Sequence, residues 1–259
     1  MDEKNNPKTL LSTKRLGEQN RILENDAQKR VLIFSLTYHP FIGGAEIAVQ
    51  EITKRLPNIS FDMITLRIDR KLPKFEKIGN VNVYRIGFSF NRHRDGYFWS
   101  NFILSFNKSI FPFIAFLKAL RLNFKNKYSA IWAIMANYAG FGAMFFKLFH
   151  PRTPYLLTLQ EGDPIAYIKK RVKFIHPVFK MIFTQADTIQ AISNYLASFA
   201  VSMGSKKKVL VVPNGVDIPH FSQKYEKYDL EALKKELGKK EASSGSEDKS
   251  ISHREADIF

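Results

Sequence analysis

The loop of residues 38–46 carries the first arrangement that could do chemistry. It follows an apolar run at residues 31–36 and places Gly43 and Gly44 directly before a helix-like segment. Adjacent glycines let the backbone approach a ligand closely, and a helix N-terminus presents unpaired N–H groups to an anion such as a diphosphate. The loop has neither the P-loop nor the G-x-G-x-x-G spacing, which disfavours ATP and NAD. A plain glycine turn is the alternative interpretation.

Two carboxylates, Glu161 and Asp163, form the second arrangement. Residues 31–221 contain only ten carboxylates, and these two lie one residue apart after the apolar run 155–159. A carboxylate at the end of a strand can act as a general base or bind substrate hydroxyl groups. The alternative is that both side chains cap the next helix, with Pro164 near its first turn.

The third arrangement is the loop that contains Asn214, Gly215 and Asp217. Asn-Gly pairs form tight turns, so a bare turn is the simpler interpretation. Ser193 begins another helix-like segment, where N-capping is its expected role. No metal site is expected, because the chain has no cysteine and its central histidines are scattered without clustered carboxylates: His39, His93, His150 and His176.

Strand-like and helix-like segments alternate along the chain and would position these loops. The predicted strands are residues 31–36, 61–66, 81–86, 129–135, 155–159, 188–192 and 209–212. The predicted helices are residues 45–56, 138–149, 165–184 with a break near Pro177, and 194–203. Strands joined by helical crossovers form a parallel sheet covered by helices on both faces. The sequence therefore predicts an α/β, doubly wound, Rossmann-like domain over residues 30–221, whose ligands bind beyond the carboxyl ends of the strands.

The flanking segments differ from this domain in composition. Residues 1–29 are polar and predict a flexible extension without a secretory signal, whereas residues 222–259 predict a short helix at 230–237 and a disordered tail. Of the total charge of +16, a net +15 belongs to residues 31–221, which hold 25 lysines and arginines against 10 carboxylates. Such a surface favours an anionic partner, either nucleic acid, a phospholipid face or a phosphorylated small molecule.

Three segments, taken together, resemble a known family. They are Pro40-x-x-Gly43-Gly44-x-Glu46, then Ala191-Ile-Ser193-x-x-Leu196, and finally Lys208-Val-x-Val-Val-Pro-Asn-Gly-Val-Asp217-x-x-x-Phe221. In this order they resemble family 4 glycosyltransferases, retaining enzymes of the GT-B fold that transfer a sugar from a nucleotide-sugar to an acceptor. The resemblance covers residues 30–221 and corresponds to the N-terminal, acceptor-side Rossmann domain of that fold.

The resemblance implies roles for the three loops. Gly43 and Gly44 would border the donor diphosphate, while Glu161 and Asp163 would face the cleft and position the acceptor hydroxyl. Gln160 stands where the family often has a histidine, and it joins these carboxylates as a candidate catalytic residue. The remaining candidates would belong to the loops around the cleft: Glu46, Ser193, Asn214, Gly215 and Asp217. The resemblance requires no metal and no cofactor besides the nucleotide-sugar, which is a substrate.

The resemblance also implies a second half. In the family, a C-terminal Rossmann domain holds most of the donor, but residues 222–259 are too few for a domain. We therefore expect little transfer activity from this chain alone, and a missing C-terminal domain or a separate subunit as its partner. The whole enzyme would build a cell-surface glycan or glycolipid from a glycan or lipid-linked acceptor.

Two stretches combine aromatic residues with cations and lack carboxylates, namely residues 97–127 and 164–186. Apolar faces flanked by cations are typical of helices that lie on an anionic membrane, although a crossover helix with solvated lysines is the alternative. The densest apolar run, residues 110–117, is too short to predict a transmembrane span. We expect a cytoplasmic protein or one at the inner face of the plasma membrane. The alternative to a glycosyltransferase is a non-catalytic basic protein that binds an anionic membrane, a partner domain or nucleic acid. The sequence has no nucleic-acid-binding motif, which favours the glycosyltransferase over a nucleic-acid-binding protein.

Overall fold

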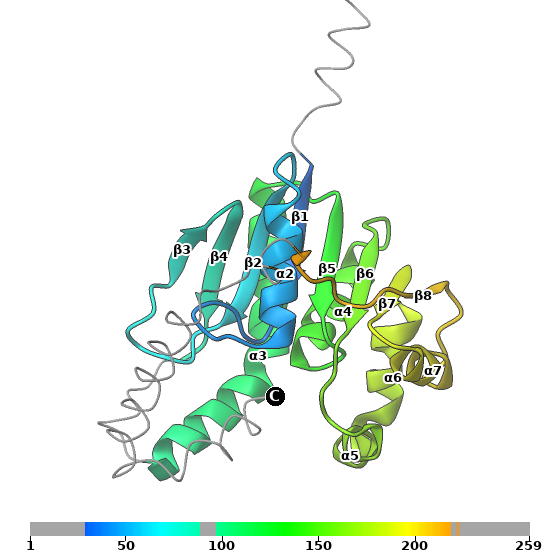
Figure 1. Ribbon diagram of the computed structural model, residues 1–259. Coiled ribbons are helices and arrows are strands. Elements are labelled where there is room, and N and C mark those ends of the chain that lie inside the picture. Colours follow the sequence, from blue (N-terminus) through cyan, green and yellow to red (C-terminus); the bar gives the residue numbers. More distant parts are fainter. Residues whose placement is uncertain (1–28, 89–96, 219–221, 223–259) are drawn as a thin grey trace, which may run out of the picture.

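A computed structural model of the chain describes residues 29–88, 97–218 and 222. Within these residues, eight strands form one sheet in the order β3-β4-β2-β1-β5-β6-β7-β8 (Figure 1). The strands are β1 (Arg30–Phe34), β2 (Ser60–Leu66), β3 (Phe75–Ile78), β4 (Val81–Ile86), β5 (Ala130–Ile134), β6 (Tyr155–Leu159), β7 (Thr188–Ala191) and β8 (Val209–Val211). The predicted Rossmann-like α/β fold is confirmed, and the first strand, predicted at residues 31–36, spans Arg30–Phe34.

One edge of the sheet departs from the prediction of a wholly parallel arrangement. Strand β3 pairs antiparallel with β4, with Phe75 opposite Tyr84 and Ile78 opposite Val81, whereas all other neighbouring strands are parallel. Strand β3 has four residues, Phe-Glu-Lys-Ile, none of which is buried. A short, half-polar edge strand lacks the continuous apolar run that identifies a central parallel strand. For this reason the sequence pattern did not predict it.

Helices cover both faces of the sheet. The helices are α2 (Gly44–Lys54), α3 (Tyr97–Lys125), α4 (Tyr138–Phe149), α5 (Ile165–Arg171), α6 (His176–Thr184) and α7 (Asn194–Ser202), and a short 3-10 helix η2 (Lys173–Ile175) links α5 to α6. The break predicted near Pro177 lies slightly earlier, at residues 172–175. Pro177 itself occupies the first turn of α6, where its missing N–H leaves no helical hydrogen bond unmade.

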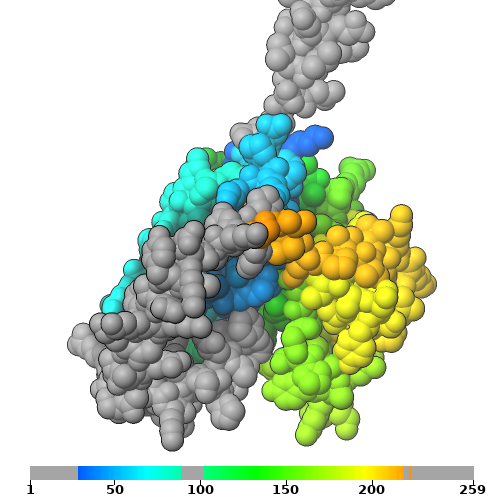
Figure 2. Space-filling model, in the orientation of Figure 1, coloured from blue at the N-terminus to red at the C-terminus, as the bar shows by residue number. Residues whose placement is uncertain are grey.

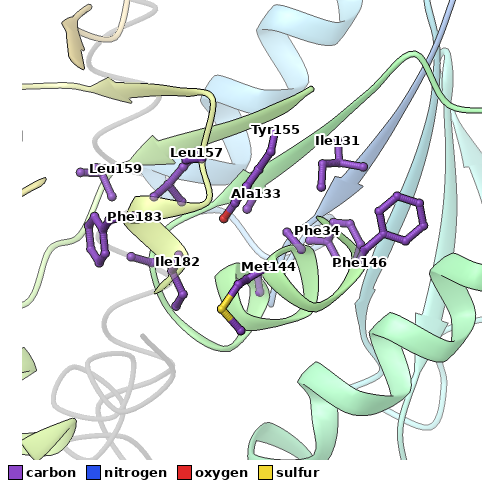
Figure 3. Packing of buried hydrophobic residues seen from close by; sticks show 14 of the residues in the cluster. Phe34, Ile131, Ala133, Met144, Phe146, Tyr155, Leu157, Leu159, Ile182 and Phe183 are labelled. Atoms are coloured by element: carbon purple, nitrogen blue, oxygen red, sulfur yellow. The ribbon is translucent and has the colours of Figure 1, made fainter. Parts of the chain in front are cut away.

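The core has a larger and a smaller cluster, one on each face of the sheet. The larger lies between the sheet and helices α3, α4, α6 and α7, and Figure 3 shows part of it, including Phe34 of β1 and Phe146 of α4. Their rings lie 6.5 Å apart, and both side chains are fully buried. The smaller cluster lies under α2, where Val49 packs with Met63 and Trp132. Burial on both faces explains why the central strands are almost wholly apolar.

Helix α3 is both a candidate membrane span and a packed helix of this domain. Residues 102–125 are long and apolar enough to cross a membrane by length and composition, which the short run at 110–117 did not predict. A core helix of a soluble protein meets the same criteria. One side of α3 is buried against the sheet through Phe111, Ala115 and Ala119, and the buried side chain of Asn107 hydrogen-bonds the backbone of Phe88. These contacts make α3 a crossover helix of the Rossmann-like domain.

Replacing Gly140 with valine is expected to lower the free energy of unfolding by about 2–3 kcal/mol, because it overpacks the contact between α4 and α6. A Cβ at Gly140 would lie 2.9 Å from the Cγ2 of Ile182 and 3.1 Å from the carbonyl oxygen of Met135. Urea unfolding measures the change. Gly215→Val is the matched control, because a Cβ at Gly215 meets no atom within 4 Å. Equal losses in both variants would contradict this packing account.

Candidate functional site

The strand order reverses at the junction of β1 and β5. From β1 the chain continues to β2 and β4 on one side, and it later returns to β5 on the other side. In open α/β sheets, ligands bind outside the carboxyl ends of the strands at such a switch point. The carboxyl ends of β1, β5 and β6 lie at the lower edge of the sheet in Figure 1. The three loops that the sequence singled out all follow strands at this edge.

The paired glycines lie where the first loop enters α2. Gly43 is the N-cap in an extended conformation with φ −127°, and Gly44 is the first residue of the helix. A Cβ at Gly44 would meet no atom within 4 Å, so the packing of the described residues does not require glycine there. No side chain caps α2, which leaves the amides of its first turn without a side-chain acceptor at the cap. This end of α2 can therefore receive an anion.

Two other residues of the first loop and its surroundings are fixed by buried polar contacts. Glu46 is buried, accepts a hydrogen bond from the Thr37 hydroxyl, and lines a small pocket with Met135. The buried Arg85 donates a 2.8 Å hydrogen bond to the carbonyl of His39. Arg85 also pairs with Glu76 of β3, with 2.7 Å between Nη1 and Oε2. Sequence reasoning missed Arg85, which anchors the loop from the edge of the sheet.

Glu161 and Asp163 line the larger pocket at this edge. The pocket has a volume of about 160 Å³ and is mostly apolar; its lining includes Leu36, Met135, Tyr138, Phe141, Ile168, Val172, Ile175 and Phe179. The Oε1 of Glu161 accepts a 2.6 Å hydrogen bond from the amide of Ala136. Its Oε2 is buried and has no hydrogen-bond partner among the described residues. The capping alternative is wrong for α5, because its N-cap is Pro164 and no side chain caps it.

Burial raises the pKa of Glu161 to about 7, from an ordinary value of 4.5. The hydrogen bond from the amide of Ala136, with the nearby amides of Glu161 and Gln160, favours the charged form and opposes part of this rise, while the charge of Asp163 adds to it. The residue as a whole is partly exposed, whereas its Oε2 is buried. Near neutral pH, Glu161 is divided between acid and base, the condition that suits proton transfer.

The second and third loops meet through Gln160 and Asn214. The Nδ2 of Asn214 donates to the Oε1 of Gln160 at 3.4 Å, although the residues are 54 positions apart. Gln160 is buried, and its own Nε2 has no partner among the described residues. A cross-strand relay supports this junction, since Thr158 donates to Gln190 at 3.0 Å and Gln190 donates to the carbonyl of Val212 at 3.1 Å. The relay fixes the chain after β8 against β6.

The other predicted loop residues have different contacts. Ser193 caps α7, accepting a 3.3 Å hydrogen bond from the amide of Leu196, which is the role expected from sequence. Asp217 pairs with Arg55 at 3.5 Å, and Arg55 is the C-cap of α2. Asp217 therefore lies at the end of α2 opposite to Gly44. Gly215 is exposed, with open space where a Cβ would lie.

Within residues 29–88, 97–218 and 222, no three histidine, aspartate or glutamate side chains converge to hold a metal ion. The groups at this edge include the amides at the start of α2, the carboxylates of Glu46, Glu161 and Asp163, two side-chain amides, and an apolar pocket whose lining also contains Lys108 and Arg171. Together they can bind an anion at α2 and a hydroxyl-bearing molecule at Glu161.

Residues 42–219 match the family model of Glycosyltransferase Family 4. The chain belongs to this family. The match includes the paired glycines of the first loop, the whole third loop and everything between them, so the family assignment and the switch-point geometry concern largely the same residues. It confirms the resemblance drawn from the loops and supports a role in sugar transfer.

Solved structures confirm the GT-B-type fold of this family 4 chain. Sucrose-phosphate synthase from Thermosynechococcus elongatus matches with a TM-score of 0.53 and 16% identity, over 74% of this chain and 49% of that one. The trehalose-6-phosphate protein from E. coli bound with UDP-2-fluoro glucose matches with a TM-score of 0.53 and 12% identity, over 81% and 55%. The trehalose-6-phosphate phosphatase N-terminal domain from Candida albicans has a TM-score of 0.53 and 13% identity, over 81% and 54%.

The family 4 chain spans about half the length of these structures. At these identities the similarity concerns the fold. A comparison with curated proteins finds no match.

Proposed function

We propose that this chain is the acceptor-side half of a GT-B glycosyltransferase that transfers a sugar from a nucleotide-sugar to a hydroxyl group of a glycan or lipid-linked acceptor. The observation that carries the proposal is the buried, unpartnered Oε2 of Glu161 in an apolar pocket at the switch point. Such an atom lacks a hydrogen-bond donor, and an acceptor hydroxyl supplies one. As the acceptor oxygen bonds to the anomeric carbon and the bond from that carbon to the diphosphate breaks, the Glu161 carboxylate takes up the hydroxyl proton, and it releases this proton to solvent after transfer.

The donor half of the proposal rests on the N-terminus of α2. The amides at Gly43 and Gly44 and the positive end of the helix dipole stabilise the departing diphosphate. A structural neighbour bound with UDP-2-fluoro glucose supports a nucleotide-sugar as the donor class. The hydrogen bond between Gln160 and Asn214 joins the loop after β6 to the loop after β8. Asp163 lies beside Glu161 in the acceptor pocket.

The donor's other contacts are proposed to come from a second domain, either in the same polypeptide or in a separate subunit. The support is that the chain spans 49% to 55% of the GT-B structures that it matches. We propose retention of the anomeric configuration, following the family resemblance. The anomeric coupling constant of the product, measured by NMR, tests retention directly.

A transfer assay tests the proposed function. Purified residues 1–259 are incubated with radiolabelled nucleotide-sugars and a lipid extract, alone and with a family 4 donor-side domain added as a separate polypeptide. We expect label in the lipid or glycan fraction only when both halves are present. Robust turnover by the chain alone would refute the need for a second half. A non-catalytic binding module predicts no transfer in either case and no binding of nucleotide-sugars.

Replacing Gly44 with alanine is expected to weaken nucleotide-sugar binding about tenfold or more while leaving the fold intact, because a methyl group would stand where the diphosphate meets the backbone. A Cβ there contacts no atom of the chain within 4 Å. Calorimetric titration with UDP-glucose measures the affinity. Gly162→Ala is the control, because its Cβ also meets open space but lies at the acceptor pocket. Equal affinities of Gly44→Ala and the unaltered chain would place the diphosphate elsewhere.

A further inference from the structure

The segment from α5 through η2 to the start of α6 exposes apolar side chains. None of the residues of α5 or η2 is buried. Phe174 is 93% exposed, and Tyr167, Ile175 and Val178 are each exposed by 41% or more. Figure 1 shows α5 below the strands of the sheet, and Figure 2 shows this part of the chain as a lobe at the lower end of the view. An exposed apolar patch of this kind in a soluble domain marks an interaction site.

The same segment is strongly cationic. Residues 164–186 contain no carboxylate and five cations, namely Lys169, Lys170, Arg171, Lys173 and Lys180. Cations at the C-terminal end of α5 also complement its helix dipole, but this effect falls off within one turn. It therefore does not account for Lys173 or Lys180, which belong to the elements that follow. The combination of net charge +5 with exposed aromatic and aliphatic groups is what an anionic lipid surface binds.

The opposite side of this segment forms a wall of the acceptor pocket. Ile168, Val172 and Phe179 line the pocket together with Glu161. Lys108 of α3 and Arg171 of α5 also line it. Whatever binds the outer side of the segment therefore lies within one helix thickness of the pocket that holds Glu161. One side of the segment is therefore exposed and can bind a surface, and the other side lines the pocket and can contact its ligand.

We propose that residues 165–180 dock on an anionic lipid membrane and bring the acceptor pocket to its surface. Phe174 and Tyr167 enter the interface between headgroups and acyl chains, and the lysines pair with anionic headgroups. The aliphatic Val178 favours lipid over nucleic acid, because an aliphatic side chain enters an apolar phase but offers no ring on which bases stack. Together with the proposed function, this docking makes the acceptor a lipid-linked molecule whose apolar part occupies the pocket.

Vesicle sedimentation of the full chain tests the docking. The vesicles contain phosphatidylcholine alone, or phosphatidylcholine with one-third phosphatidylglycerol, at low salt. We expect binding to the anionic vesicles, and a roughly 100-fold weaker partition coefficient for the triple variant K169Q/K170Q/K173Q. Phe174→Ser is expected to weaken the partition coefficient about tenfold at unchanged charge. All three lysines and Phe174 are exposed, so thermal unfolding should stay within a few degrees of the unaltered chain.

Two matched controls come from the opposite edge of the sheet. Lys206, Lys207 and Lys208 directly precede β8, so K206Q/K207Q/K208Q changes the net charge equally. Phe124, 92% exposed near the end of α3, matches Phe174 in exposure. We expect both controls to keep vesicle binding within a factor of about three. Equal losses in the controls, binding to neutral vesicles alone, or preference for single-stranded RNA would overturn the proposal. Nucleotide-sugar binding is measured separately, so failure of docking leaves the test of the proposed function intact.

Discussion

Replacing Glu161 with glutamine is expected to stabilise the folded chain at pH 8 by up to about 3 kcal/mol and to abolish its part in sugar transfer. Burial raises the pKa of this carboxyl to about 7. At pH 8 the folded protein must hold a buried negative charge whose Oε2 has no partner among the described residues. Glutamine keeps an oxygen for the amide of Ala136 and removes the charge. Residues that lower the stability of the fold are typically kept at functional sites, where their activity requires them.

The pH dependence follows from the direction of this shift. Below pH 4.5 the carboxyl of Glu161 is protonated in both the folded and the unfolded chain, so the two variants should not differ through this group. Between pH 4.5 and about 7 the unfolded chain releases the proton while the folded chain keeps it, so stability is lost as pH rises. The advantage of Glu161→Gln should therefore grow across this window and level off above it.

Urea unfolding at pH 4, 6 and 8 measures the difference between Glu161→Gln and the unaltered chain. Glu51→Gln serves as the control, because Glu51 is partly exposed on α2 and its ion pair in the described part of the chain is with Arg55, one helical turn later. We expect the control to change stability by less than about 0.5 kcal/mol at each pH. A loss of stability in Glu161→Gln at pH 8 would show that the carboxylate is not a buried charge.

Asp62→Ala is expected to lower the free energy of unfolding by about 3–5 kcal/mol, the largest loss that we predict. Asp62 lies in the middle of β2 with none of its surface exposed. Its carboxylate accepts four hydrogen bonds, from Tyr128 at 2.6 Å, Asn82 at 2.8 Å, and Arg30 and Asn126 at 3.3 Å each. Removing it leaves these donors without their acceptor and takes the counter-charge from Arg30.

This cluster fastens the end of α3 to the edge of the sheet opposite the candidate site. Burial and the hydrogen bond to Asp62 raise the pKa of Tyr128, which keeps its hydroxyl protonated as a donor near neutral pH. Thermal and urea unfolding of Asp62→Ala measure the loss, with Glu51→Ala as a control for an exposed carboxylate. A decrease of less than about 1 kcal/mol in the free energy of unfolding would contradict a stabilising role of the hydrogen bonds around Asp62.

The central fold was predictable because its strands are buried on both faces. A short continuous apolar run such as residues 155–159 is typical of a strand covered on both faces, and β6 begins and ends at the predicted residues. The helix predicted at residues 138–149 also matches α4. Strand β3 could not be predicted, because four half-polar residues at an edge give no periodic signal. The predictions for residues 1–28, 89–96, 219–221 and 223–259 lie outside the described residues.

The candidate site was predictable only in part. Paired glycines and clustered carboxylates indicated two of the loops, since their residue types are unusual in a basic chain. The partner of Glu161 is a backbone amide, that of Ala136, which no side-chain pattern reveals. Met135, the residue before Ala136, lines both pockets and has a left-handed φ of 69°. This strained backbone conformation has no recognisable sequence pattern. Asn137 gave a usable signal, because an asparagine directly before a predicted helix is a preferred N-cap, and it caps α4.

The position of Asp217 shows why a motif does not fix geometry. The loop containing Asn214 and Asp217 leaves β8 as one segment, yet Asn214 reaches Gln160 while Asp217 reaches Arg55 at the far end of α2. An extended residue advances the chain by about 3.3 Å, so three residues suffice to leave the pocket. The sequence analysis assigned both residues to one cleft loop, because the sequence alone does not show the direction in which the chain runs between them.

The most direct test of the account is an amide chemical-shift map of the isotope-labelled chain during titration with UDP-glucose. The account predicts shifts that cluster at the first turn of α2 around Gly44, at Ala136 and Glu161, and at Asn214, with the largest at Gly44. Shifts confined to the lysines of α5 or to the edge strand β3, or an unchanged spectrum at millimolar UDP-glucose, would contradict the assignment of this sheet edge as one wall of a sugar-transfer cleft.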